Sequence, residues 1–550
     1  LAALREIEPV NLSIQMSSLN INAQEFVPGA AVFSPSVAGP SGLCSRGLSP
    51  FTKYGNEPTP ASPSKSPPES TCSREKSLGA IPKTSKSSLK AKSGERPNKR
   101  KKNEEHGKGK LGNKKNCIEV KSLKEHINFV LIGHVDAGKS TIGGQIMSLT
   151  GMIDKRTLDR YETQAREISR ESWYLSWALD TNDEERQKGK TVEIGRAYFE
   201  TETKHFTILD APGHKCFVPN MIGGSAQADI AVLVVSARRG EFETGFEKGG
   251  QTMEHALLAK TSGVKYLITV VTKMDDPTVN WDEDRYLYCK EKLIPYLYKL
   301  GFEQEKDLYF LPVSGLTGHG ILSEIPYEFC NWYRGSSLVS LLDKLPAINR
   351  DKEGCFVMPV SDKYKDMGLI LMGKVEAGVA QLGKSLILMP NKVPVVVDQM
   401  WTDDIEVTTV ACGENVKIKL KGIEEEEVSV GFVLCGIDNP ISIATVFDAQ
   451  LVILETKSII CAGYSAIMHI HCVAEEVVVK GIICLINKKT GTKTTVRPRF
   501  VKQGQVAIMR IECSGPVCME KFIDYEHLGR IALRHENITV AFGKVLKLVK

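Results

Sequence analysis

The sequence predicts a disordered N-terminal tail, then a doubly wound α/β domain, and then two antiparallel β-barrels. Three observations predict this order. Pro, Ser, Gly and Lys dominate residues 1–120; short apolar runs alternate with helix-compatible stretches over residues 121–348; and period-two alternation takes over after residue 351. A chain of 550 residues is also too long for one hydrophobic core, so several domains are expected.

The tail is expected to stay disordered because runs such as 58–70 cannot bury enough apolar surface to offset chain entropy. Residues 81–125 hold fifteen Lys/Arg against five Asp/Glu, so the net charge of +5 comes from this segment and not from the folded body. The stretch 99–115 is expected to be a charged, self-repelling linker. The alternative is a loose attraction to RNA, because clustered cations release phosphate counterions.

The α/β domain is predicted from buried-strand patterns that alternate with helical ones. The apolar runs lie at 127–133, 206–209, 230–235, 266–271 and 308–313, and helix-compatible stretches include 139–149 and 251–261. This domain is expected to end near residue 347. Beyond it, Val416, Ile418 and Leu420 alternate with lysines and glycine turns recur, which predicts two barrels at 351–440 and 445–550.

A phosphate-binding loop is predicted at Gly133–Ser140, which reads GHVDAGKS and fits G-x-x-x-x-G-K-[ST]. It follows a predicted strand and opens a predicted helix, which is the context that this loop requires. Backbone N–H groups would close around phosphate oxygens, Lys139 would bridge the β- and γ-phosphates, and Ser140 would ligate Mg²⁺. The expected nucleotide-contacting residues here are Gly133, His134, Val135, Asp136, Ala137, Gly138, Lys139, Ser140 and Thr141.

A γ-phosphate sensor is predicted at Asp210–His214 (DAPGH), which closes another strand. Asp210 would hold Mg²⁺ through water, and the Gly213 N–H would contact the γ-phosphate. His214 is expected to orient the attacking water, the alternative being a purely structural histidine. Thr191, between the two segments, is the expected switch residue, because a threonine there can ligate Mg²⁺ only while the γ-phosphate is present.

Guanine recognition is predicted at Thr272–Asp275 (TKMD), again after a predicted strand. The Asp275 carboxylate can accept hydrogen bonds from N1–H and N2–H₂ of guanine, which adenine does not offer. The methylene stem of Lys273 can cover the face of the base. A following loop of Ser314, Gly315 and Leu316 is expected to donate a backbone N–H to the guanine O6. The substrate is therefore expected to be GTP, with GDP as product.

Other classes of protein are disfavoured. Fourteen cysteines occur without a CxxC pair, so neither zinc ligation nor a disulfide framework is expected. We expect instead that the cysteines are reduced thiols in the cytosol. The longest aliphatic runs are far shorter than a membrane span. Residues 1–30 lack a basic start followed by an apolar block, so no signal peptide is expected. The expected location is cytoplasmic, with no membrane partner.

These segments together resemble the translational GTPases, of which DAPGH, QTMEH at 251–255 and the two following barrels are typical. Within that group, stretches at 173–197, 204–224, 362–368 and 421–427 resemble the GTP-binding subunit of the eukaryotic peptide chain release factor, the class II release factor. The resemblance covers roughly 120–550. It implies a ribosome-associated GTPase that binds the class I release factor and couples GTP hydrolysis to stop-codon-dependent peptide release. Thr272 stands where Asn is usual in this family, which would weaken one link to the phosphate-binding loop.

Two partner surfaces are implied by the same resemblance. Residues 19–28 (LNINAQEFVP) are similar to the motif that docks onto poly(A)-binding protein, with Leu19 and Phe26 as apolar anchors. The segment 529–536 is similar to the family segment implicated in holding the class I release factor. Arg530 and Arg534 are four residues apart, so in a strand both would point to one face and suit a carboxylate cluster. The alternative is that they are ordinary surface charges.

Three other functions stay open at this point. A ribosome-rescue GTPase carrying the paralogue of the stop-codon reader shares the nucleotide motifs, but the tail motif and residues 188–193 argue against it. An elongation factor delivering aminoacyl-tRNA is disfavoured by the long tail. A GTPase-impaired adaptor that tethers poly(A)-binding protein is favoured mainly by Thr272.

Overall fold

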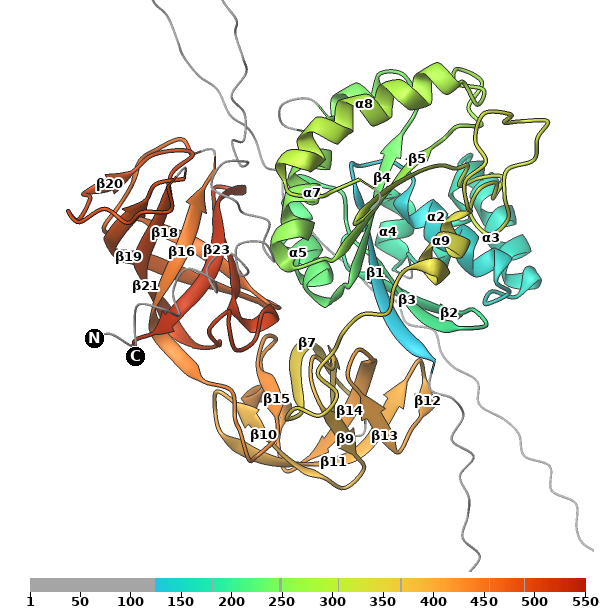
Figure 1. Ribbon diagram of the computed structural model, residues 1–550. Helices are drawn as coiled ribbons and strands as arrows, with labels where there is room; N and C mark the ends of the chain where they lie inside the picture. The colour runs from blue at the N-terminus through green and yellow to red at the C-terminus, as the bar shows by residue number, and fades with distance from the viewer. Residues whose placement is uncertain are drawn as a thin grey trace, which may run out of the picture. The chain divides into compact units, whose positions relative to one another are not determined.

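The computed structural model describes residues 124–550 apart from 181, 247–249, 305, 367, 455 and 489. The predicted tail, its basic linker and the anchors Leu19 and Phe26 lie outside the described residues. The described part begins with an α/β domain and continues into two β-domains, as Figure 1 shows. The predicted fold class is thereby confirmed for these residues.

The α/β domain is built on one six-stranded sheet with the order β2-β3-β1-β4-β5-β6. Neighbouring strands run parallel except β2, which pairs antiparallel with β3 at the edge. The strands are β1 (Glu125–Gly133), β2 (Gly195–Glu200), β3 (Lys204–Asp210), β4 (Ile230–Ser236), β5 (Tyr266–Thr272) and β6 (Leu308–Pro312). The helices are α2 (Lys139–Leu149), α3 (Lys155–Glu167), α4 (Asp183–Lys188), α5 (Val218–Gln227), α6 (Glu241–Phe246), α7 (Gln251–Ser262), α8 (Glu283–Lys299) and α9 (Leu338–Lys344). All five apolar runs that predicted strands lie in β1, β3, β4, β5 and β6.

Alternate residues along the strands form two hydrophobic layers, because successive side chains of a strand point to opposite faces. Val130 and Ile132 of β1 pack in the layer under α5, α7 and α8. Phe129 and Leu131 pack in the other layer, under α2 and α9. Figure 1 shows these two groups of helices on opposite sides of the sheet. This two-sided burial explains why the strands read as continuous apolar runs.

The second domain is a closed ring of strands. Its sheet order is β10-β15-β7-β8-β14-β11-β12, and an additional β10–β11 pairing closes it, while β9 and β13 form a separate pair. The strands are β7 (Val357–Lys365), β8 (Leu369–Lys374), β9 (Val379–Gln381), β10 (Ser385–Met389), β11 (Val393–Thr402), β12 (Ile405–Glu406), β13 (Thr409–Ala411), β14 (Asn415–Lys421) and β15 (Val433–Cys435). The alternation predicted in β14 is confirmed, since Val416, Ile418 and Leu420 are buried in the core of this barrel.

The third domain is a closed barrel with the order β16-β21-β19-β18-β22-β23, and a pair β17–β20 lies beside it. The strands are β16 (Ile443–Ile453), β17 (Ile460–Cys461), β18 (Ser465–Ile470), β19 (Val473–Ile486), β20 (Phe500–Val501), β21 (Val506–Cys518), β22 (Arg530–His535) and β23 (Ile538–Leu548). Its interior is filled by apolar residues of every barrel strand. In the described part of both barrels the helical turns are short 3₁₀ turns, as the scarcity of helical patterns predicted.

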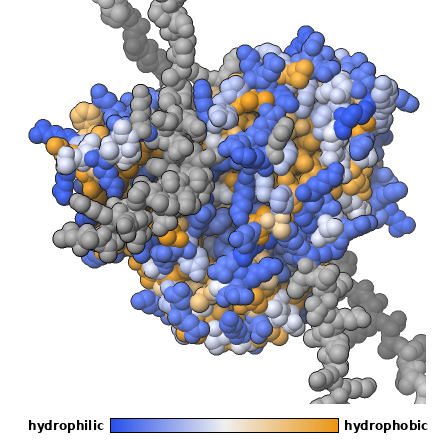
Figure 2. Space-filling view, in the orientation of Figure 1, coloured by the Kyte–Doolittle hydropathy of each residue, from blue (hydrophilic) through white to orange (hydrophobic). Residues whose placement is uncertain are grey.

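Figure 2 shows hydrophobic residues in scattered patches among hydrophilic ones on the face that it displays. Among the residues that the structure describes, no helix combines the length and apolar character that crossing a membrane would need.

Candidate nucleotide-binding site

The loop between β1 and α2 adopts a conformation that depends on glycine. Gly133 has φ 144° and Gly138 φ 97°, and Asp136 between them has φ 58°. A Cβ atom on Gly133 would lie 2.2 Å from the Val234 carbonyl oxygen, so any side chain there would clash with the neighbouring strand β4. The loop therefore passes close to the sheet and leads into the first turn of α2, where free N–H groups favour an anion.

Lys139 is the cation of this loop. Its ammonium donates to the carbonyl oxygens of His134 (2.9 Å) and Gly133 (3.3 Å), and only 6% of the residue is exposed. Burial lowers the pKa of Lys139. Gly213 lies directly opposite, because a Cβ atom on it would be 2.5 Å from the Lys139 ammonium. The predicted phosphate-contacting groups of the two segments are thus brought together.

A cluster of hard oxygen donors lies beside Lys139. The Ser140 and Thr191 hydroxyls are 3.2 Å apart, and Thr191 donates to the Asp180 carboxylate at 3.2 Å. Asp210 is fully buried, and neither of its carboxylate oxygens has a hydrogen-bond partner among the described residues. Burial raises the pKa of Asp210 to about 6, and burial together with the Asp210 charge raises the pKa of Asp180 to about 7.

Asp180 and Asp210 are two buried carboxylates that repel one another, and the oxygens of Asp210 have no hydrogen-bond donor among the described residues, so a cation between them would be stabilised. Hydroxyl and carboxylate oxygens are the ligands that Mg²⁺ prefers. The residues present therefore fit the predicted magnesium ion. Sequence reasoning missed Asp180 as a site residue: it follows a short 3₁₀ turn, η2 (Ser176–Ala178), inside the stretch 173–197, to which no nucleotide-binding role had been assigned apart from Thr191. The described residues contain no cluster of three or more His, Cys, Asp or Glu side chains that would hold a metal by themselves.

The predicted base-recognition residues lie at the ends of β5 and β6. The Thr272 hydroxyl donates to the Ala137 carbonyl oxygen at 2.7 Å, so this threonine does link the base-recognition segment to the phosphate-binding loop. The Lys273 ammonium is held by Glu241 at 2.7 Å. The Ser314 N–H is already used, since it donates to the His319 carbonyl oxygen at 3.0 Å. Ser314 therefore shapes the loop, and its neighbours Gly315 and Leu316 face the ligand space.

One cleft of about 690 Å³ joins these parts, which is the size of a site for a small ligand. The predicted residues that line it are Val135, Asp136, Ala137, Gly138, Lys139, Ser140, Thr141, Thr191, Gly213, His214, Thr272, Lys273, Asp275, Gly315 and Leu316. The other predicted residues of the site, Gly133, His134, Asp210 and Ser314, do not line this cleft. Trp173 and Asp180 also line the cleft and were not predicted.

His214 lines the same cleft in the turn that follows β3. Its Nδ1 accepts a hydrogen bond from the Cys216 N–H at 3.3 Å, which fixes the ring relative to the backbone. In the neutral imidazole the proton then sits on Nε2. The side chain is half-buried, so it is accessible from the cleft.

His255 is a second histidine of the site that sequence reasoning did not single out. It lies on α7 and is fully buried, and its Nδ1 accepts from the Gly133 N–H at 3.2 Å. Burial lowers the pKa of His255 to about 3, so the ring is neutral and can accept. It ties α7 to the first residue of the phosphate-binding loop. The QTMEH stretch that contains it was the available signal.

Arg530 and Arg534, predicted to share one face that suits a partner's carboxylate cluster, are not ordinary surface charges, because both are largely buried. Both lie on β22, and they are only 8% and 3% exposed. Arg534 is 3.8 Å from Glu254 of α7, and a Cβ atom on Gly263 would lie 2.8 Å from the Arg530 side chain. The spacing does put both on one face, but the chain's own α/β domain covers that face.

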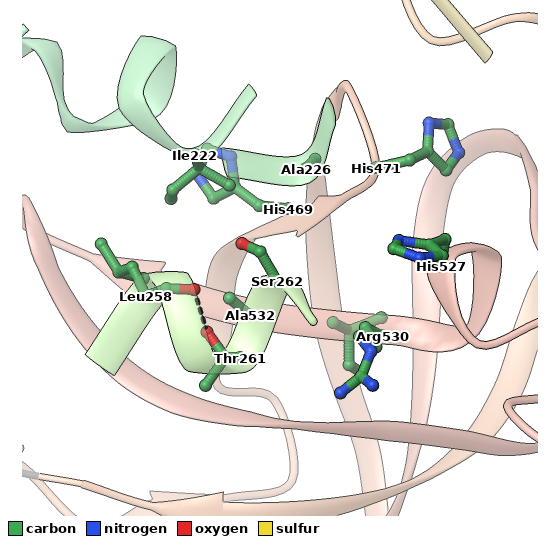
Figure 3. Close-up of a pocket in the computed structure, with 11 residues that line it drawn as sticks. Ile222, Ala226, Leu258, Thr261, Ser262, His469, His471, His527, Arg530 and Ala532 are labelled. Carbon is green, nitrogen blue, oxygen red and sulfur yellow. Dashed lines mark hydrogen bonds between the residues drawn. The ribbon is translucent and has the colours of Figure 1, made fainter. Parts of the chain in front are cut away.

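Figure 3 shows this junction. Arg530 and Ala532 of β22 lie near Leu258, Thr261 and Ser262 of α7 around a small cavity. Three histidines also line the cavity, and burial lowers the pKa of two of them, His469 and His471, to about 4. The cavity is therefore lined by neutral side chains and one arginine at neutral pH.

Comparison with known proteins finds three family models that match parts of the chain. The elongation factor Tu GTP binding domain model matches residues 124–349, the GTP-eEF1A C-terminal domain-like model matches residues 446–546, and the Ataxin-2 C-terminal region model (PAM2) matches residues 15–31. The S. cerevisiae Ski7 GTPase-like domain, bound to GDP and inorganic phosphate, has a TM-score of 0.64 at 14% identity, over 77% of this chain and 97% of that one. That likeness shows the fold alone.

Curated relatives are much more similar in sequence. The eukaryotic peptide chain release factor GTP-binding subunit of Kluyveromyces lactis is 49% identical over 428 residues, which are 78% of this chain and 61% of that protein. The Zygosaccharomyces rouxii protein of the same name is 47% identical over 78% of this chain and 65% of its own length. The chain thus spans less than two thirds of these relatives. It belongs to the family of the GTP-binding subunits of the eukaryotic peptide chain release factor.

Proposed function

We propose that this chain binds and hydrolyses GTP and, together with the class I release factor, couples that hydrolysis on the ribosome to stop-codon-dependent peptide release. The observation that carries the proposal is one cleft lined by Lys139, His214 and Asp275, with Asp210 buried near Lys139. The family to which the chain belongs supports the partners and a cytoplasmic location. The PAM2 match at residues 15–31 supports poly(A)-binding protein as a further partner.

Each part of the cleft has a distinct role in this proposal. The phosphate-binding loop, from Gly133 to Thr141, takes the phosphates, with Lys139 against the β- and γ-phosphates. Ser140, Thr191 and Asp210 would hold Mg²⁺, which supplies charge neutralisation at the phosphate oxygens. Asp275 accepts from guanine, Lys273 covers its face, and the loop at Gly315 and Leu316 offers N–H groups to its O6.

His214 orients the water that attacks the γ-phosphate. Hydrolysis breaks the bond between the γ-phosphorus and the bridging oxygen, and the water oxygen takes its place, so GDP and inorganic phosphate leave without a covalent intermediate. The Gly213 N–H beside Lys139 reports whether the γ-phosphate is present, and Thr191 reports it through the metal. Loss of both contacts would release the switch segments after hydrolysis.

The alternative of a GTPase-impaired adaptor rested on Thr272. The hydroxyl-to-Ala137 hydrogen bond supports an intact link between base and phosphate sites and so weakens that alternative. The match to the PAM2 model weakens the ribosome-rescue alternative in the same way.

The test is GTP hydrolysis by the full chain with ribosomes and the class I release factor. His214→Ala is expected to leave GTP binding nearly unchanged and to reduce stimulated turnover by a factor of roughly 10²–10⁴, the usual range for a positioned proton-handling or water-orienting group. Lys215→Ala is the matched control, because Lys215 is exposed in the same turn and does not line the cleft. Equal turnover by both variants would refute the role of His214.

A further inference from the structure

The segment that joins β19 to β21 is an unusual part of the third domain. It comprises residues 487–504, here called the basic loop, and it includes the short strand β20. It contains six Lys/Arg and no Asp/Glu. Figure 1 shows β20 in the loop region beside β19, at the margin of the third domain.

The basic loop accounts for the net positive charge of the third domain. Residues 445–550 hold fifteen Lys/Arg and nine Asp/Glu, and six of the fifteen cations lie in the basic loop. The remainder of the domain therefore carries nine charges of each sign and is neutral. A charge excess confined to one loop creates a local positive potential that attracts polyanions.

Lys480 and Arg510 of the barrel strands are paired with carboxylates, whereas four exposed cations of the basic loop have no carboxylate beside them among the described residues. Lys480 on β19 lies 2.5 Å from Glu512, and Arg510 on β21 lies 2.8 Å from Asp448. Lys493, Arg497, Arg499 and Lys502 are exposed, and among the described residues no carboxylate lies within 4.0 Å of any of them. Within the described part of the chain, no carboxylate therefore balances the charge of these four side chains.

The backbone of the basic loop is nevertheless held in place. Gly491 N–H donates to the Asn487 carbonyl at 2.8 Å, and Thr494 N–H donates to the Leu485 carbonyl at 2.9 Å. Further on, β20 pairs with β17. The backbone that carries the cations is therefore already ordered. A ligand that binds these cations would cost the protein less conformational entropy than a ligand that binds a free tail.

Two apolar side chains are exposed among these cations. Val496 is 80% exposed and Phe500 is 43% exposed, and the Lys502 ammonium lies 5.8 Å from the centre of the Phe500 ring. An exposed aromatic ring between cations is the arrangement by which proteins hold single-stranded nucleic acid, since the ring stacks on an unpaired base while the cations contact phosphates.

We propose that the basic loop is an RNA-binding surface that takes a single-stranded or looped segment. Lys493, Arg497, Arg499 and Lys502 contact the phosphates, and Phe500 stacks on one unpaired base. The choice of RNA over other polyanions rests on the proposed function at the ribosome and on the Phe500 ring, which an acidic peptide would not need. The surface is separate from the nucleotide cleft and from the covered face of Arg530 and Arg534.

The test uses the full chain and a fluorescein-labelled 20-nucleotide RNA that contains 4-thiouridine. Ultraviolet cross-linking followed by peptide mapping is expected to find RNA on the segment 494–502. This readout is specific to the site, so RNA bound by the basic linker at 99–115 does not obscure it. GTP hydrolysis is not measured, so the result is independent of the catalytic proposal.

Affinity is measured by fluorescence anisotropy between low and high KCl. A variant with Lys493→Gln, Arg497→Gln, Arg499→Gln and Lys502→Gln is expected to lose the cross-link and to lower the slope of log K against log [KCl] by about 3, because each phosphate contact contributes about 0.7 for a single strand. Phe500→Leu is expected to weaken binding of the single strand about tenfold and to leave a 20-base-pair duplex unaffected.

The matched control carries four substitutions of exposed cations on α3 and α8: Lys155→Gln, Arg156→Gln, Lys292→Gln and Lys299→Gln. It is expected to keep the cross-link and the salt slope. An equal fall in slope in both variants, or cross-links that map only to other segments, would overturn the proposal. Binding of poly-glutamate that depends on the basic loop, with RNA binding unaffected by its loss, would assign the surface to an acidic protein instead.

Discussion

Thr272→Val removes one hydroxyl at the junction of the base and phosphate sites and keeps the size of the side chain. Thr272 is 2% exposed, and its hydroxyl donates to Ala137, which is 3% exposed. The Ala137 carbonyl would then be buried without this donor, at a cost of about 1–3 kcal/mol. The empty loop can relax and let water reach the carbonyl, whereas a bound nucleotide would hold the loop closed. The cost therefore falls on the bound state, and affinity for GDP should drop by roughly 5–150-fold.

The assay is titration with a fluorescent GDP analogue, alongside thermal unfolding of the nucleotide-free chain. Thr272→Ser is the control, since it keeps the hydroxyl and should bind nearly as tightly as the unmodified chain. Thr272→Asn should tighten binding only slightly, because the link is already made. A valine variant that binds as well as the serine variant would refute the reasoning, and a large gain with asparagine would show that threonine is a defect.

Asp275→Asn should shift preference from guanosine toward xanthosine nucleotides by on the order of 1–3 kcal/mol, measured by competition for the cleft, and an unchanged preference would remove Asp275 from base recognition. Asp229→Asn should lower the free energy of unfolding by about 3–5 kcal/mol in urea, because Arg350 (2.6 Å) and Lys374 (3.0 Å) would be left as buried cations without their carboxylate. Although burial opposes it, Lys374 and Arg350 lower the pKa of Asp229 to about 2, so its contribution is complete above about pH 4 and is lost as pH falls toward 2, a loss that the Asn variant should not show. A peptide of residues 15–30 should bind the C-terminal domain of poly(A)-binding protein, and Phe26→Ala should remove more than about 2 kcal/mol in calorimetry, whereas equal binding would make the motif accidental.

Local patterns were sufficient for the parts of the site that lie at strand ends. The phosphate-binding loop, the Asp210–His214 segment and the Thr272–Asp275 segment each follow a buried parallel strand, and parallel strands deliver their carboxyl ends to one edge of the sheet. Asp180 and His255 were missed for a different reason. Asp180 lies in an irregular stretch and meets Thr191 only through the tertiary fold, and His255 reads as one more residue of a helix.

The antiparallel edge strand β2 was also absent from the predicted sheet. Its sequence, GRAYFE, mixes polar and apolar residues, because an edge strand is not buried along its whole length. Buried strands can therefore be recognised in the sequence by continuous apolar runs, whereas edge strands cannot. Helix α3 was also not predicted, for the same reason: Ala165 is its buried residue, so little of the helix is buried.

Arg530 and Arg534 show that the spacing of residues along a strand predicts which face a side chain occupies, but not whether that face is exposed. Spacing decides which face of a strand a side chain occupies, and it placed both arginines on the same face correctly. What covers that face is decided by long-range packing, and here α7 covers it with Glu254 and Gly263. Replacing both arginines by glutamate would put one carboxylate beside Glu254 and another beside Glu526, and would loosen the contact between the α/β domain and the third domain. A loss of partner binding in that variant could thus result from separation of the two domains as readily as from a lost contact with the partner. Substitutions in the exposed basic loop, in contrast, leave the contact between the two domains intact.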